Sequence, residues 1–183
     1  MRKPQMKKEQ NHAPPLSLLP LLPCCSLRLR ICSYTESSPR LKAALRLALI
    51  SDLHSCLYGQ EQEELLKALT EQQPDLICLS GDIIDDKKPP EGARCLFSAI
   101  GKQYPCYYTS GNHEARSGQI RLLKEEIRNY GLQVLEGTGQ ILEIKGQRLY
   151  IAGVDDPSAF SEGDLPGSWQ AQLDAAAAGL GKE

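Results

Sequence analysis

From Leu45 onward, apolar runs of strand length alternate with segments of helical period, and this alternation constrains the fold most. We expect strands at residues 45–50, 75–80 and 104–109, and helices at 60–73 and from Pro90 onward. Parallel strands need crossovers of this kind, so the pattern predicts the α/β class with a mainly parallel sheet. The run at 45–50 is apolar without interruption, which predicts a strand buried on both faces.

The pattern changes after the third predicted strand. A third helix is expected with Ser117 as its N-cap and Gly131 as its stop. Beyond it, the segments 141–144 and 148–151 predict a β-hairpin, and residues 167–179 predict the start of another helix.

The first 44 residues differ in character from the rest. Basic residues precede a short apolar run at 16–22, but four prolines lie in or beside that run, which argues against an export signal. We therefore expect residues 1–44 to be a leader, disordered or forming an edge strand at 27–34, and residues 45–183 to be the domain. No stretch reaches the length of about 18 apolar residues that a membrane-spanning helix needs.

Composition narrows the location and the partners. Seven cysteines without paired spacing favour reduced thiols, so we expect a cytoplasmic protein, with membrane association or export as the less favoured alternatives. The 21 basic and 23 acidic residues leave a net charge of -2, which gives no signal for a nucleic-acid partner.

Polar side chains follow each of the three predicted strands directly. They are Asp52 and His54, then Asp82 and Asp85, then Asn112 and His113. The carboxyl ends of parallel strands meet at one edge of a sheet, where α/β proteins bind ligands. Carboxylates and imidazoles suit Mn, Fe or Zn, so the three clusters together predict a metal centre, although any one of them alone is more typical of a turn or a loop.

In this order, and at intervals of 30 residues from Asp52 to Asp82 to Asn112, the clusters resemble the first three motifs of the calcineurin-like metallophosphoesterases. The resemblance covers about residues 45–157. A later Gly-Val-Asp-Asp-Pro stretch, residues 153–157, is similar to the bacterial branch of small phosphodiesterase-type members. The resemblance implies a four-layer αββα sandwich and a hydrolase that uses two divalent metal ions, Mn, Fe or Zn.

The resemblance also implies roles for single residues. It assigns the metal ligands to Asp52, His54, Asp82 and Asn112. Asp82 would bridge the two ions. His113 would protonate the leaving group, and Asp85 would orient its imidazole.

Two departures from the family pattern shape the expected function. Where protein phosphatases place a phosphate-binding Arg after the second motif, this chain has Asp86, Lys87 and Lys88. We therefore expect a phosphodiester or a small phosphorylated molecule as substrate.

The second departure is that no histidine follows His113, although the later family motifs supply histidine ligands. We expect a C-terminally truncated domain with an incomplete second metal site. The alternative to an active enzyme is an impaired fragment that acts as a metal-binding or interaction module, with an exposed sheet available for self-association.

Overall fold

A parallel β-sheet organises the chain, for which the computed structural model describes residues 29–161 and 163–180. Its strands, in spatial order, are β1 (Leu47–Ile50), β2 (Leu76–Ser80), β3 (Cys106–Thr109) and β4 (Gln133–Val134). Each strand pairs in parallel with the next, as the alternation of apolar runs and helices predicts. The carboxyl ends of β1, β2 and β3 therefore lie at one edge.

Helices cover one face of this sheet. They are α1 (Glu63–Gln72), preceded by the 3₁₀ turn η1 (Gln60–Gln62), then α2 (Glu91–Ile100) and α4 (Ile120–Asn129). Their apolar stripes pack with the inward residues of the strands into one core, in which Ile77, Leu96, Phe97 and Ile127 are at most 1% exposed.

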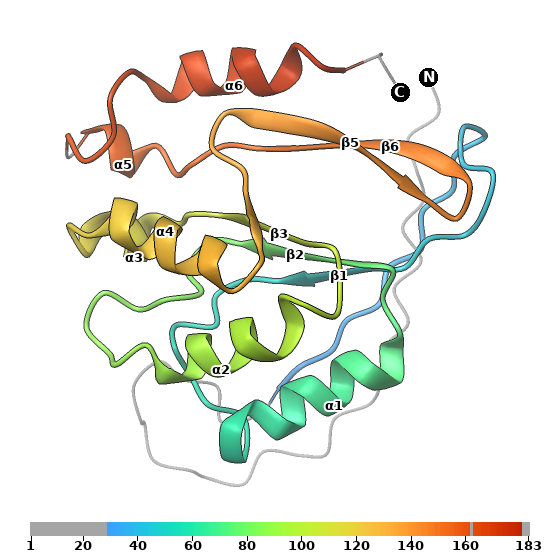
Figure 1. Ribbon diagram of the computed structural model, residues 1–183, viewed down its shortest axis with the longest axis horizontal. Coiled ribbons are helices and arrows are strands. Elements are labelled where there is room, and N and C mark those ends of the chain that lie inside the picture. Colours follow the sequence, from blue (N-terminus) through green and yellow to red (C-terminus); the bar gives the residue numbers. More distant parts are fainter. Residues whose placement is uncertain (1–28, 162, 181–183) are drawn as a thin grey trace, which may run out of the picture.

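A hairpin covers the other face. It consists of β5 (Thr138–Ile144) and β6 (Gln147–Gly153), antiparallel around the expected turn. The short helices α3 (Asn112–Arg116) and α5 (Ser158–Ser161) contact each other near the strand ends, and α6 (Trp169–Ala177) packs on β5 and β6. Figure 1 shows α1 and α2, the parallel sheet, the hairpin and α6 stacked in succession.

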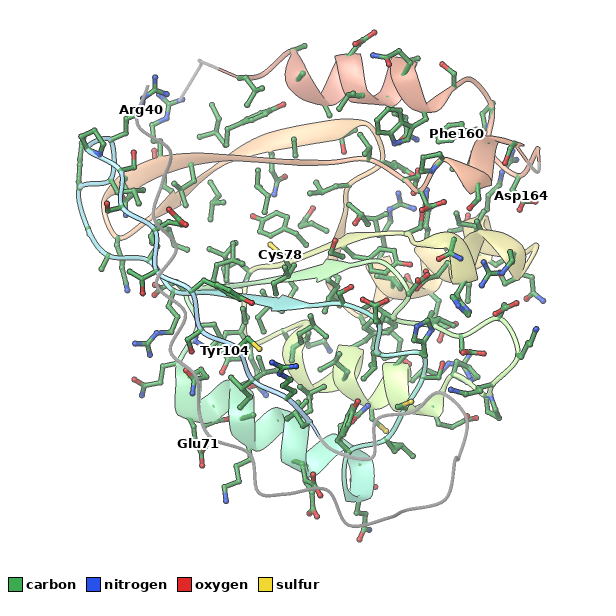
Figure 2. All side chains as sticks on the ribbon, turned by 180° about the vertical axis from the view of Figure 1, so that it is seen from behind. Arg40, Glu71, Cys78, Tyr104, Phe160 and Asp164 are labelled. Carbon is green, nitrogen blue, oxygen red and sulfur yellow. The ribbon has the colours of Figure 1, made fainter. Side chains whose placement is uncertain are left out.

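A second, smaller apolar cluster fills the space between the sheet and the hairpin. Leu76, Tyr107 and Leu135 are its buried members, and Cys78 packs against them. Figure 2 shows Cys78 on the side of the sheet that faces the hairpin and Tyr104 on the side of α1 and α2. Burial raises the pKa of Cys78 to about 11, so this thiol is a packing group.

The expectation that the first strand is buried on both faces is wrong. Leu47 and Leu49 are 52% and 64% exposed, whereas Ala48 and Ile50 pack against the helix-side core. The reason is position: β1 is the edge strand of the sheet, and the apolar residues of the hairpin pack over β2 and β3.

Two local expectations also need correction. Ser117 ends α3 instead of capping the next helix: its hydroxyl donates to the Glu114 carbonyl, and α4 begins after Gln119. The edge strand expected at 27–34 lies partly outside the described residues, and residues 29–34 form no strand.

The mixed α/β class is confirmed, and with it the parallel sheet between helices and a hairpin. The complete four-layer sandwich stays a prediction. No helix among the described residues is long and apolar enough to cross a membrane.

Candidate metal centre

The loops that follow β1 and β2 run side by side beyond the ends of their strands. The backbone N–H of Asp52 donates to the Gly81 carbonyl at 3.3 Å, and that of His54 donates to the Asp82 carbonyl at 2.9 Å. The parallel register of β1 on β2 thus continues into the loops and brings the first two polar clusters together.

Three of the predicted ligands have left-handed backbone conformations. The φ angles are 56° at Asp52, 47° at His54 and 54° at Asp82. Residues other than glycine adopt this region at a cost of about 1–3 kcal/mol, and they do so mainly where a site needs it. The backbone hydrogen bonds between the two loops hold these conformations in place.

Two glycines allow the loops after β2 and β3 to approach closely. A Cβ on Gly81 would lie 2.9 Å from the Gly111 Cα, and one on Gly111 would lie 2.4 Å from Asp82 Oδ1. The glycine before Asn112 is therefore required because the Asp82 carboxylate occupies the space that a side chain would take.

The buried carboxylate of Glu114 joins the loop after β2 to the loop after β3 by hydrogen bonds. We call this set of hydrogen bonds the Glu114 cradle. Its Oε1 accepts from the N–H groups of Ile83 and Ile84 at 2.8 and 2.9 Å, and its Oε2 accepts from those of Asp82 and Gly111, both at 2.9 Å. The side chain is fully buried. Burial raises the pKa of Glu114, and the backbone donors offset part of that effect.

Several side chains of the loops held by the Glu114 cradle bring atoms that can bind a metal close together. Ligand atoms of His54, Asp82 and His113 lie within 4.8 Å of one another. The Nδ1 of His54 is buried without a hydrogen-bond partner, and its nearest carboxylate oxygen, on Asp85, is 3.7 Å away. Asp52 lies at the rim, 67% exposed, with Oδ1 3.8 Å from His54 Nε2.

The contact between Asn112 and Asp82 tests whether these residues suit a cation. With its NH₂ toward Asp82, the Asn112 amide donates to Oδ1 and Oδ2 at 3.1 and 2.8 Å, and its oxygen accepts from Arg116. With the amide oxygen toward Asp82, oxygen faces oxygen, and a cation between the two acceptors would stabilise this arrangement. Carboxylate, amide and imidazole donors at these positions fit a divalent ion.

His113 is oriented by a residue next to the one expected. Its Nδ1 lies 2.6 Å from Asp86 Oδ1 but 3.8 Å from Asp85 Oδ2. Burial acts to raise the pKa of Asp86, but the hydrogen bond and charge of His113 outweigh it, so that the pKa is lowered. Asp85 instead accepts from the two N–H groups that follow Asp86, and these donors with Lys88 outweigh burial and lower its pKa.

A buried ion pair joins α4 to the segment that follows β6. The Lys124 amino group, 2% exposed, lies 2.7 Å from the Asp155 carboxylate and 2.9 Å from Glu136. Asp155 also accepts from the hydroxyl of Ser110 at 2.6 Å and from Gln172 at 2.8 Å. These contacts fix the wall of the site next to Asn112.

A cleft of about 280 Å³ opens at this wall. The loops that follow β2, β3 and β6 line it together with Trp169 of α6, and Asp82 and Asn112 form part of the lining. A substrate in this cleft would therefore contact two of the predicted ligands.

The structure thus brings His54, Asp82, Asn112 and His113 together and leaves Asp52 at the exposed rim. The contacts of the site also involve residues to which the sequence alone assigned no role in it, namely Asp86, Glu114, Arg116 and Lys124. Glu114 stands three residues after Gly111, in the spacing of a capping box, which is a signal that could have identified it.

Known proteins similar to this chain share one description. Residues 45–166 match the family described as calcineurin-like phosphoesterase. A Caenorhabditis elegans protein named as a metallophosphoesterase is 29% identical over 127 residues. Uncharacterised metallophosphoesterases of Bacillus subtilis and Campylobacter jejuni are 28% and 25% identical over 131 and 130 residues.

The alignments cover 66%, 69% and 68% of this chain but only 26%, 48% and 33% of the three relatives in the same order. The chain therefore spans between about a quarter and about half of the length of the relatives it matches.

Proposed function

This chain belongs to the calcineurin-like phosphoesterase family, and from that premise we propose that it hydrolyses phosphate esters with divalent metal ions bound at the ends of β1, β2 and β3. The observation that supports this best is the group formed by His54, Asp82 and His113, whose ligand atoms lie within 4.8 Å of one another. The buried Nδ1 of His54 has no hydrogen-bond partner among the described residues, and a cation would give this ring and the Asp82 carboxylate a common partner.

We assign one ion to Asp52, His54 and Asp82, and a second to Asp82 and Asn112. Mn, Fe or Zn would suit the mixture of oxygen and imidazole ligands. When bound, such ions polarise a phosphoryl oxygen and make water a nucleophile at neutral pH. The protein's own part is to hold Asp82 between the two positions, which the Glu114 cradle achieves by fixing its backbone.

His113 is the proposed proton donor to the leaving group. Asp86 holds its Nδ1, so the ring keeps one orientation and Nε2 remains to deliver the proton. The backbone N–H of His113 donates to Asp82 Oδ1 at 2.9 Å, which ties the proton donor to the bridging ligand. Asp85 Oδ2 lies 3.8 Å from Nδ1, too far for a hydrogen bond to the ring.

For the substrate we propose a phosphodiester or a small phosphorylated molecule. The volume of the cleft, about 280 Å³, is at the small end of ligand pockets, which suits a phosphate with a compact substituent. The proposed cytoplasmic location stays a prediction.

A direct test measures metal content by elemental analysis and hydrolysis of bis(p-nitrophenyl) phosphate and p-nitrophenyl phosphate with added Mn²⁺. We expect Asp82→Asn to lose both bound metal and turnover. His113→Asn should keep its metal and lose turnover by about 10²–10⁴-fold. Asp174→Asn, on the exposed face of α6, is the matched control. Turnover that survives both site substitutions would refute the proposal.

The second candidate is a metal-binding or interaction module without turnover. It is supported by the small ligand set of the second position, for which the described residues offer Asp82 and Asn112. One equivalent of metal that depends on Asp82, without hydrolysis of either ester, would decide in favour of this alternative.

A further inference from the structure

Arg116 ends α3 one helical turn after Asn112 and contacts two groups of the site. Its Nε lies 3.6 Å from Asp86 Oδ2. Its Nη2 lies 3.3 Å from the end of the Asn112 amide, and its Nη1 contacts the same atom. The side chain is 38% exposed, so the guanidinium borders solvent and has room to move.

The contact between Arg116 and Asn112 depends on which way the amide points. With NH₂ toward Asp82, the amide oxygen accepts from the guanidinium, and both groups are satisfied. A ligand bond from the amide oxygen to a cation beside Asp82 reverses the amide and turns its NH₂ toward Arg116. Donor then faces donor, because a guanidinium has no acceptor. A metal at Asn112 and the Arg116–Asn112 hydrogen bond therefore exclude each other.

We propose that Arg116 binds the phosphoryl oxygens of the substrate, and that a metal ion at Asn112 releases it for this role. The inference rests on the proposed function. A guanidinium presents a planar fork of donors that matches phosphate oxygens. Once its bond to Asn112 is lost, the remaining partner of Arg116 in the site is Asp86, at a distance longer than a hydrogen bond.

The negative charge of the site explains why it is useful that a bound metal controls whether Arg116 is available to phosphate. We call this control the Asn112 gate. Four carboxylates surround the site, those of Asp52, Asp82, Asp85 and Asp86. Without metal this concentration of negative charge repels a phosphate, and Arg116 is engaged by Asn112. With metal, the charge is compensated and the guanidinium becomes available at the same moment. Phosphate binding is thereby coupled to metal binding.

The contacts of Lys88, unlike those of Arg116, should not depend on a bound metal. Its amino group lies 3.7 Å from Asp85 and 3.9 Å from the sulfur of Cys56. Neither residue is an assigned metal ligand, so a bound metal does not change these contacts. Lys88→Met therefore removes one positive charge near the site without touching the Asn112 gate, and it is the matched control for Arg116→Met.

The experiment measures two affinities by calorimetry on the full chain: that of Mn²⁺ alone, and that of inorganic phosphate with Mn²⁺ present. Arg116→Met should weaken phosphate binding about tenfold, because a charge-assisted bidentate contact is lost. It should also tighten Mn²⁺ binding about threefold more than Lys88→Met does, because the competing hydrogen bond to Asn112 is gone. Arg116→Lys keeps the positive charge. Its affinities for phosphate and for Mn²⁺ should therefore both lie between those of the unmodified chain and those of Arg116→Met.

Opposite changes in the two affinities support the gate, whereas weaker binding of both ligands would show that Arg116 only maintains the structure and would overturn it. Equal effects of Arg116→Met and Lys88→Met would reduce the inference to net charge and also overturn it. If the unmodified chain binds Mn²⁺ and hydrolyses esters but Arg116→Met changes neither affinity, only this inference fails. If the unmodified chain binds no Mn²⁺, the proposed function fails with it.

Discussion

The acidic residues of this protein fall into two groups that differ in how their oxygens are satisfied. Glu114 and Asp155, at most 1% exposed, accept hydrogen bonds or an ion pair at both carboxylate oxygens. Asp52 is 67% exposed at the rim, and Asp82 faces an amide that satisfies it in only one of its two orientations. The comparison separates carboxylates that hold the scaffold from carboxylates that we propose as metal ligands.

The largest effect should come from breaking the buried ion pair of the first group. Lys124→Met leaves the Asp155 carboxylate buried without its cation, and we expect the free energy of unfolding to fall by about 3–5 kcal/mol. Urea unfolding measures this. Adding Asp155→Asn should restore part of the loss because the unpaired charge disappears. Asp52→Asn, in the second group, should change stability by less than about 0.5 kcal/mol.

Glu114→Gln should destabilise the protein by about 2–4 kcal/mol, because an amide can serve only two of the four N–H donors and turns its own NH₂ toward the others. Glu125→Gln, exposed on α4, is the matched control and should have little effect. If the two variants unfold at the same urea concentration, the distinction between scaffold and ligand carboxylates does not hold for Glu114.

Added metal should stabilise the protein through the second group of carboxylates, Asp52 and Asp82, and not through the first. At a Mn²⁺ concentration of 100 times its dissociation constant, the unmodified chain should gain about 2.7 kcal/mol of unfolding free energy. Asp82→Asn should gain none, and a chelator should remove the gain. Thermal unfolding with and without Mn²⁺ measures the difference. An equal gain in Asp82→Asn would place the ion elsewhere.

The smallest effect concerns Asp75, a scaffold carboxylate near the surface. The hydrogen bond from Lys145 at 2.7 Å and that from the Arg46 N–H at 2.8 Å lower its pKa. Because the pKa of Asp75 is lower in the folded state, its ionised carboxylate stabilises the fold at pH values above the unfolded pKa of 3.8. This contribution to stability is lost as the pH falls through the folded pKa.

Asp75→Asn should therefore cost about 0.5 kcal/mol at neutral pH, and the difference from the unmodified chain should shrink toward about pH 2.5. Urea unfolding at the two pH values measures it, and a difference that grows on acidification would contradict the assignment.

The elements that the sequence predicts well are those with strong periodicity and a clear stop. The first three strands and the helix between Pro90 and Gly101 agree with the structure because burial repeats along them. The exposure of Leu47 and Leu49 could not be predicted in this way. Their exposure depends on the place of β1 in the sheet and on which strands the hairpin covers, and both are tertiary properties.

For the site, the residue types at the strand ends were sufficient to predict that His54, Asp82 and Asn112 lie close together. They were not sufficient to choose between Asp85 and Asp86 as the partner of His113, because the backbone conformation of the loop decides which of two adjacent carboxylates points to the ring. Lys124 was missed since a lysine on an apolar helix face is ordinarily read as exposed at its tip, and only the folded chain shows the carboxylate that it meets.

The Glu114 cradle also sets an order of events during synthesis. The N–H groups of residues 82–84 acquire their acceptor only after a residue 30 to 32 positions further along the chain has been made. Until then the loop after β2 is held by its hydrogen bonds with the loop after β1, and its own N–H groups lack the Glu114 carboxylate. The loop that carries Asp82 is thus completed only when the third strand has docked, so under the proposed function an ion would be retained by chains that have folded through β3 and lost from those that have not.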